Sequence, residues 1–398
     1  MWRMHSTLRI TALLLLALPA SVHAVQVCDV DGQHVNPANG NTTAGKTGLM
    51  RCRDGADGRL MREQELRGGV FIGVVRHYRD GFLQREHQVN ERGNRDGLAR
   101  EFAATTTPNQ LLLEETLRDG TAVGLARAWH PNGRLRRVSF SDDAGREVAL
   151  ARYTPQGQLG ELRCGPRSVL KPDVADDALC GHAADKPVTV ALYADDGTLR
   201  SRLTHERGER RRNELLWDNG QLREQQEMGP AGGSERSFSA DGVKRREQRW
   251  VAVGDGTRSR RVTTLDQEFH ESGKLVRERR WRVTERGSEL ELEQTWYLNG
   301  QAKARLEYLS SESQPARRDT AFHDNGKMAA EGLWLLKGRY DTVASGIHKQ
   351  FDEAGRLRRE RHHDGRGRVN RERDLDEAGA VTRDEEVFED GSRKALGR

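Results

Sequence analysis

Short stretches in which apolar and polar residues alternate recur along most of the chain, separated by turns that contain glycine. After Gly300, for example, Ala302, Ala304, Leu306 and Tyr308 alternate with polar or charged residues. A period of two is typical of β-strands. Many of the turns carry Asn-Gly or Asp-Gly, the pairs that accept positive φ in tight hairpins. The pattern therefore predicts a series of β-hairpins.

A fixed spacing relates each turn to an aromatic residue and a leucine. At Gly133, Trp129 lies four residues before the glycine and Leu135 two residues after it. This frame, with shorter and weaker copies, predicts an array of roughly twelve units, most of them about 22 to 31 residues apart. The predicted turn glycines are Gly81, Gly133, Gly157, Gly197, Gly220, Gly242, Gly273, Gly300, Gly326 and Gly355.

A second aromatic residue recurs eight positions past the turn glycine in four consecutive units, at Trp250, Trp281, Tyr308 and Trp334. Aromatic residues on both strands of each hairpin predict a ladder that stacks along one face of a continuous antiparallel sheet. We expect this ladder to be the core. Its predicted members are Tyr78, Trp129, Tyr153, Tyr193, Trp217, Trp250, Phe269, Trp281, Tyr308, Phe322, Trp334 and Phe351.

The composition agrees with a narrow core and a polar, solvent-exposed surface. Only 35% of the residues are hydrophobic, and 32% are charged. A repeat array buries a thin stripe and leaves its other face in water, so a low apolar content is expected of it. The 66 basic and 61 acidic residues nearly balance, which argues against nucleic acid as a partner.

The unit GLARAWHPNGRL, residues 124 to 135, resembles the bacterial variant of the MORN repeat, and the resemblance covers much of residues 70 to 391. It implies an elongated, twisted sheet of hairpins with a role in binding. Many bacterial relatives are labelled antitoxin or immunity-like, which implies a protein that binds and neutralises a toxic effector. MORN repeats are also linked to membranes, so the alternative is an envelope-associated structural or lipid-binding protein. The spacing is looser than in the eukaryotic form, and the second family glycine is often absent.

The N-terminus has the three parts of a signal peptide. Arg3 and Arg9 are basic, residues 10–20 are apolar, and Val22-His23-Ala24 forms a cleavage site. We expect cleavage after Ala24 and export, with the periplasm as the destination. The residue before Cys28 is Val27 rather than a small residue, so a lipoprotein is not expected.

Four cysteines in an exported chain predict two disulfides. Among the three possible connectivities, local pairing of Cys28 with Cys52 and of Cys164 with Cys180 is the simplest. The expected organisation is a signal peptide (1–24), a disulfide-linked segment (25–69), a first repeat block (70–160), a cysteine-bracketed insertion (161–187) and a second repeat block (188–398).

Residues that could carry chemistry do not form a catalytic or metal-binding motif. His130, His270 and His323 each follow the aromatic residue of a unit, so their recurrence follows from the repeat. His362 and His363 stand beside Asp364 without a second ligand motif, and the cysteines contain no CxxC. The prediction is a non-enzymatic protein with no cofactor and no metal, whose partner is another protein.

Overall fold

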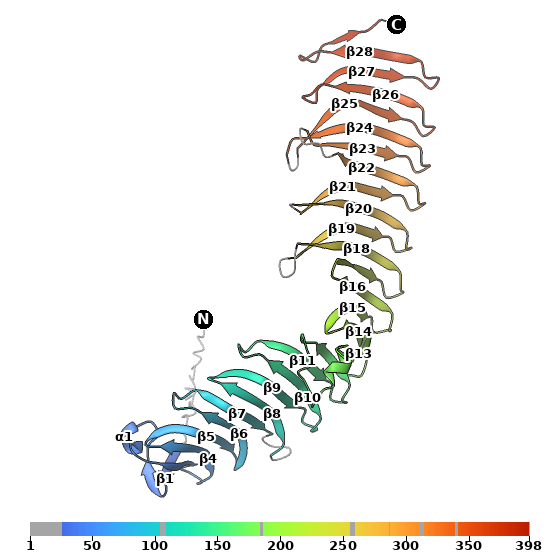
Figure 1. The fold of residues 1–398 in the computed structure, drawn as a ribbon. Helices are drawn as coiled ribbons and strands as arrows, with labels where there is room; N and C mark the ends of the chain where they lie inside the picture. The colour runs from blue at the N-terminus through green and yellow to red at the C-terminus, as the bar shows by residue number, and fades with distance from the viewer. Residues whose placement is uncertain are drawn as a thin grey trace, which may run out of the picture. The chain divides into compact units, whose positions relative to one another are not determined.

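The computed structural model describes residues 26–103, 109–183, 186–254, 259–285, 287–309, 314–338 and 341–397. The predicted signal peptide and its cleavage site lie outside these residues. Almost all regular structure is antiparallel strand, which confirms the predicted all-β fold (Figure 1). The chain divides into two compact units, residues 1–135 with 141–146, and residues 136–140 with 147–398. In the described ranges no helix is long and apolar enough to cross a membrane.

The first sheet has the strand order β12-β11-β10-β9-β8-β7-β6-β5-β4-β3-β1-β2. β4 pairs with β5, so the predicted N-terminal segment continues directly into the sheet of the repeats. A short helix, α1 (Gly40–Thr43), follows β2. The strands are β1 (Gln26–Val30), β2 (Gln33–Val35), β3 (Gly48–Asp54), β4 (Leu60–Arg67), β5 (Val70–Arg79), β6 (Phe82–Val89), β7 (Arg95–Phe102), β8 (Leu111–Arg118), β9 (Thr121–Trp129), β10 (Leu135–Ser141), β11 (Glu147–Tyr153) and β12 (Leu159–Arg163).

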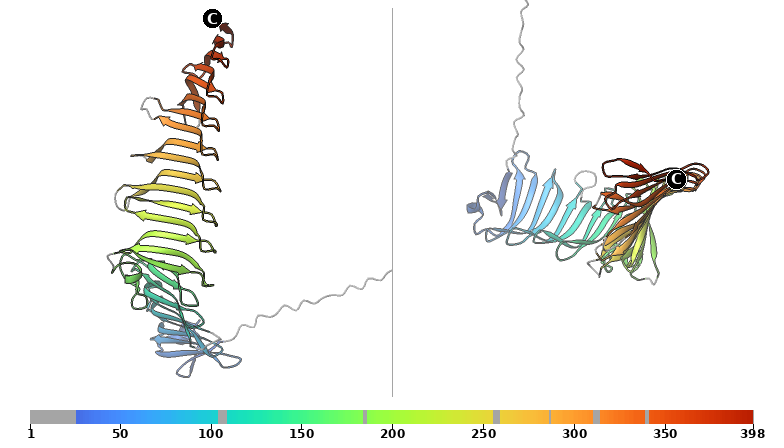
Figure 2. Two further views of the ribbon diagram at one scale, coloured as in Figure 1. Left: turned by 90° about the vertical axis from the view of Figure 1, so that its right-hand side faces the viewer. Right: turned by 90° about the horizontal axis from the view of Figure 1, so that it is seen from above.

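The second sheet runs from β13 to β29, and each strand pairs with the next in the chain, as Figure 2 shows. The insertion before it contains α2 (Asp176–Leu179). The strands are β13 (Val188–Tyr193), β14 (Leu199–Glu206), β15 (Glu209–Leu216), β16 (Leu222–Gly229), β17 (Gly232–Phe238), β18 (Lys244–Val253), β19 (Arg260–Phe269), β20 (Leu275–Thr284), β21 (Gly287–Trp296), β22 (Ala302–Leu309), β23 (Ala316–Phe322), β24 (Met328–Leu336), β25 (Thr342–Phe351), β26 (Leu357–His363), β27 (Val369–Leu375), β28 (Val381–Val387) and β29 (Arg393–Ala395).

Nine of the ten predicted turn glycines close a five-residue turn of one kind. At Gly273 the backbone N–H of His270 donates to the carbonyl of Lys274, and the N–H of Gly273 donates back to His270, both at 2.9 Å. All ten predicted turn glycines have φ between 79° and 91°, a region that glycine enters without strain. Gly81 is the one predicted turn glycine that does not close this kind of turn. Of the predicted Asn-Gly and Asp-Gly pairs, only Asp80-Gly81 has positive φ at both residues. The other pairs have positive φ only at the glycine.

In the turns at Gly220, Gly300 and Gly326, the asparagine before the glycine links one turn to the next. Asn325 Oδ1 accepts the N–H of Lys327 at 2.9 Å, and its Nδ2 donates to the carbonyl of Glu353 in the following turn at 2.7 Å. Asn219 and Asn299 make the same two kinds of bond, reaching Ala240 and Asp324. We call Asn219, Asn299 and Asn325 the turn clamps.

Both disulfides pair locally, which confirms the simplest predicted connectivity. Cys28 on β1 lies opposite Cys52 on β3, and the pair is buried in a small apolar core with Val35 and Met50. The second bridge joins Cys164, just after β12, to Cys180, just after α2. No cysteine in the described chain is free, and this pairing is typical of proteins from an oxidising, exported environment.

The middle of the second sheet is buried by polar side chains rather than by the aromatic ladder. Glu247 is 4% exposed and receives hydrogen bonds from Lys244 at 2.9 Å and Arg249 at 2.8 Å, while Glu278 is 6% exposed. Strand pairing aligns these residues in a continuous polar row: Arg202, Glu214, Gln225, Arg236, Glu247, Gln267, Glu278, Gln294, Arg305, Thr320, Glu331, Lys349, Glu360, Arg373 and Asp384.

The predicted aromatic core residues are only half-buried. All twelve, from Tyr78 to Phe351, are of intermediate exposure, and none belongs to the buried core. The expectation that they form the core is therefore wrong, because ion pairs and hydrogen bonds fill the centre of the sheet instead. This polar filling also accounts for the low apolar content of the chain.

The last strands hold two carboxylates whose ionisation should make the sheet sensitive to acid. Burial alone would raise the pKa of Glu372, but hydrogen bonds from Arg393 and Arg361 lower it to about 2. Hydrogen bonds from Arg371 and Arg373 outweigh burial at Asp384 and also lower its pKa to about 2. A lowered folded-state pKa stabilises the protein above the unfolded-state pKa, and that stability is lost as pH falls toward 2.

We therefore expect the urea midpoint of the second unit to be steady above about pH 5 and to fall between about pH 5 and 2. Glu372→Gln should make this decline shallower, because it removes one titrating group. Equilibrium unfolding curves followed by tryptophan fluorescence at a series of pH values would measure the effect. A midpoint that did not change across this range would show that these ion pairs contribute nothing to stability.

Candidate functional site

One face of the second sheet carries the four aromatic residues that recur after the turns. Asp266 pairs with Arg279, and Trp281 lies two residues further along β20, so all three point to the same side. Tyr308 and Trp334 both pair with Arg317, and the same pairing rows place Trp250 on this side as well. We call this side, with Trp250, Trp281, Tyr308 and Trp334, the aromatic face.

The other predicted aromatic column lies on the opposite face. Glu268 pairs with Arg277 on the aromatic face, so Phe269, the next residue, points away from it. A register shift between Glu268 and Phe269 adds one residue after the turn and lets Phe269 pair with Leu275. Phe322 and Phe351 follow equivalent register shifts. The prediction that both columns share one face is therefore wrong.

Cations, rather than other aromatic rings, cover three of the four rings on the aromatic face. The guanidinium of Arg261 lies 3.5 Å from the ring centre of Trp250, and that of Arg279 lies 5.5 Å from Trp281. Arg317 takes the equivalent place over Tyr308 at 5.9 Å. Contacts of this kind stabilise a pair by about 0.5–1 kcal/mol at exposed sites. The face therefore alternates flat rings with positive charge.

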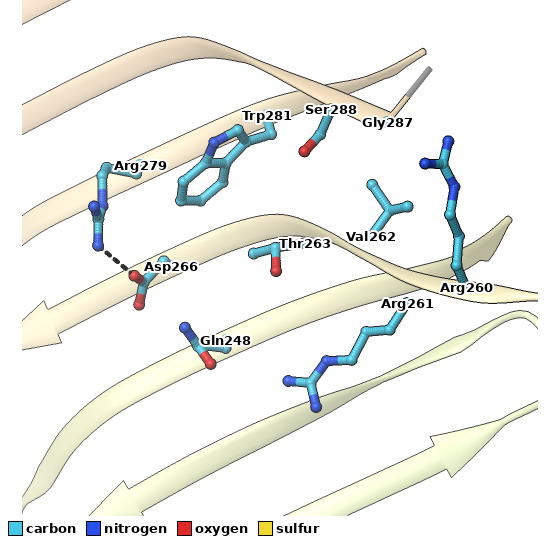
Figure 3. Close-up of a pocket in the computed structure, with 10 residues that line it drawn as sticks. All are labelled: Gln248, Arg260, Arg261, Val262, Thr263, Asp266, Arg279, Trp281, Gly287 and Ser288. Atoms are coloured by element: carbon cyan, nitrogen blue, oxygen red, sulfur yellow. Dashed lines mark hydrogen bonds and ion pairs between the residues drawn. The ribbon is translucent and has the colours of Figure 1, made fainter. Parts of the chain in front are cut away.

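A hollow of about 440 Å³ opens on the aromatic face beside Trp281 (Figure 3). Asp266 and Arg279 form an ion pair at one side of it, and Arg260 and Arg261 lie at the other, as Figure 3 shows. The lining is therefore positive overall. The residues that line it are Gln248, Arg260, Arg261, Val262, Thr263, Asp266, Arg279, Trp281, Gly287 and Ser288.

Asp266 anchors this hollow. Its side chain is 3% exposed and accepts hydrogen bonds from Arg246 at 2.9 and 3.0 Å and from Arg279 at 2.6 Å. Burial alone would raise the pKa of Asp266, but the hydrogen bonds and charge of the two arginines lower it below its usual range. Asp266 is therefore ionised at neutral pH and holds Arg279 in place.

Arg279 keeps unused hydrogen-bonding capacity at this site. Its Nε is buried and has no hydrogen-bond partner among the described residues. A donor of this kind is costly to leave unpaired. The ring of Trp281 and the hydroxyl groups of Thr263 and Ser288 line the same hollow, so it presents an apolar surface and hydrogen-bonding groups beside the positive charge. This arrangement suits binding, and the described chain has no group of three His, Cys, Asp or Glu placed to hold a metal ion.

Trp217 lies in a turn, not on a strand. Leu216 occupies the strand position that precedes it and pairs with Leu222, while Trp217 begins the turn and donates from Nε1 to the carbonyl of Phe238 at 3.1 Å. His323 makes the equivalent contact with the carbonyl of Phe351 at 3.1 Å, whereas His270 contacts Ser272 within its own turn. Sequence reasoning missed Arg261, Arg279 and Asp266, whose only signal is their spacing from Trp250 and Trp281.

Comparisons with known proteins identify no family. No family model matches the chain, and no curated protein matches it, so the resemblance to MORN repeats gains no support from them. A chain in the crystal structure of TcdB2-TccC3-Cdc42 is similar over 93% of this chain and 20% of its own length, at 13% identity and a TM-score of 0.18.

A chain in the crystal structure of TcdB2-TccC3 is similar over 87% of this chain and 19% of its own length, at 10% identity and a TM-score of 0.17. This protein therefore spans about a fifth of the length of those chains. TM-scores this low support no conclusion about its fold or function.

Proposed function

We propose that this chain is a non-enzymatic, exported repeat protein that binds an acidic surface of another protein with its aromatic face. The observation that carries the proposal is the row of rings and guanidinium groups with a positive hollow at Trp281. Tryptophan, tyrosine and arginine are the residues that dominate binding energy at protein interfaces. The paired cysteines support an exported protein.

The more specific proposal is that the partner is a toxic effector, which this chain neutralises as an immunity-type protein. It is supported by the resemblance of the repeats to bacterial MORN variants. An immunity protein is expected to be encoded beside its effector and to bind it tightly. The test is to co-express the mature chain with the product of each neighbouring gene and to measure binding and protection of cells.

Two variants connect such binding to the aromatic face. Arg261→Gln and Trp281→Ala should each weaken binding about tenfold or more, since each removes a central contact. Arg280→Gln is the matched control, because Arg280 follows Arg279 on β20 and points to the opposite face. Affinity should also fall as salt rises.

Equal affinity for Arg261→Gln and Arg280→Gln would contradict a role of the aromatic face. The envelope-associated, lipid-binding alternative would instead be favoured if the mature chain bound no product of a neighbouring gene and sedimented with anionic vesicles at low salt.

A further inference from the structure

A second hollow, of about 530 Å³, lies where the cysteine insertion packs against the first strands of the second sheet. Its wall is fixed, because Gly208 donates to the carbonyl of Cys180 at 2.8 Å and Arg207 donates to that of Gly181 at 3.1 Å. Leu192, Ser201, Leu203 and Cys164 are among the residues that line it. The insertion therefore builds one side of a preformed pocket of ligand-binding size.

Two residues that line this pocket carry buried polar atoms without hydrogen-bond partners among the described residues. His205 is 3% exposed, and its Nδ1 has no hydrogen-bond partner among the described residues. The Oδ1 of Asn213, on the neighbouring strand, is also buried and unpartnered in the described chain. Leaving such a group unsatisfied destabilises the folded protein. Two in one pocket point to a ligand that supplies their partners.

The charges around the pocket favour an anion. Arg210 lines it and forms no ion pair with any residue in the described ranges. Arg163 pairs with Glu147, and Glu161 lies 3.5 Å from Arg152, so those charges are compensated. Burial, together with the charges of Arg210 and His182, lowers the pKa of His205 to about 4. The imidazole is therefore neutral at pH 7, with one nitrogen that donates and one that accepts.

We propose that this pocket binds a small carboxylate that carries a hydroxyl or amide N–H next to the acid group. The carboxylate pairs with Arg210 and accepts a hydrogen bond from His205 Nδ1. The hydroxyl or N–H of the ligand donates to Asn213 Oδ1. Two sources share this chemistry, a sugar acid and the carboxyl end of a peptide. The site is separate from the aromatic face, so this inference does not depend on the proposed protein partner.

The test uses the mature chain with two probes, D-gluconate and N-acetyl-L-alanine, and with N-acetyl-L-alaninamide as a control that lacks the carboxylate. Binding would be followed by calorimetry and by NMR of isotope-labelled histidines. We expect one of the acids to bind saturably and to shift the His205 signals, while the amide does not. The acid that binds identifies the source.

Arg210→Gln should weaken that binding about tenfold or more. Arg212→Gln is its matched control, since Arg212 lies on the same strand but points to the opposite face. Arg210 is exposed, so its replacement leaves the fold intact, which circular dichroism would verify. The proposal is overturned if neither acid binds, if the amide binds equally well, or if Arg210→Gln binds as the unaltered chain does.

Discussion

Replacing Asp266 with alanine should lower the free energy of unfolding of the second unit by about 3–5 kcal/mol. The substitution leaves Arg246 and Arg279 facing each other without the carboxylate that both of them bind. Arg279 is 27% exposed, and the other carboxylate near it, that of Glu268, lies farther away at 3.8 Å. Urea unfolding followed by tryptophan fluorescence would measure the loss, and Trp281 would report on the local change.

Asp266→Asn separates the loss of charge from the loss of volume, since it keeps the shape of the side chain. Its free energy of unfolding should lie between that of the unaltered chain and that of Asp266→Ala. Asp218→Ala is the control for removing an aspartate from an exposed turn, and it should change stability by no more than about 0.5 kcal/mol. If Asp266→Ala were as mild as Asp218→Ala, the buried cluster of Asp266 with Arg246 and Arg279 would not be what stabilises this part of the sheet.

Gly232→Ala should lower the free energy of unfolding by about 3 kcal/mol or more. Gly232 has φ of 151°, and a Cβ there would lie 2.2 Å from the carbonyl oxygen of Trp250 and 2.8 Å from Cα of Val251. Both are backbone atoms of the paired strand, so relief requires β17 and β18 to separate. The change should therefore alter the fluorescence of Trp250 as well as the unfolding curve.

Gly220→Ala is the matched control, because it also has a positive φ, 81°, but its Cβ would meet nothing within 4 Å. It should cost only the conformational penalty, about 1–2 kcal/mol. Equal losses in the two variants would mean that the contact with β18 is relieved cheaply and that only the backbone conformation matters.

The hairpins, the positions of the turn glycines and the two local disulfides could be predicted from the sequence. These features depend on contacts between residues close in the chain, such as Gly273 with His270 or Cys28 with Cys52. Spacing along the sequence records such contacts directly, since a turn fixes both of its ends.

The side of the sheet on which each aromatic lies could not be predicted in the same way. Phe269 and Trp281 are separated by an even number of residues, which implies one face if alternation is continuous. A register shift at Phe269 adds a residue and reverses the parity. Nothing in the letters at 275–277 marks that extra residue.

The polar centre was hidden for another reason. Glu247 and Asp266 resemble ordinary charged surface residues in the sequence, and only strand pairing brings Arg236 beside one and Arg279 beside the other. Whether a charge is solvated or buried is decided by residues from neighbouring strands. The same limit applies to His205 and Asn213, which meet only when β14 and β15 pair.

The turn clamps have a consequence for how this chain can change in length. Each of Asn219, Asn299 and Asn325 reaches only the next turn on its own side of the sheet, and the bond it makes is to a backbone carbonyl. Every residue type supplies such a carbonyl, so a clamp does not depend on the sequence of the hairpin it holds. Gain or loss of a whole pair of strands by gene duplication or deletion would therefore leave each clamp a partner. The length of the sheet can change in this way by two strands at a time.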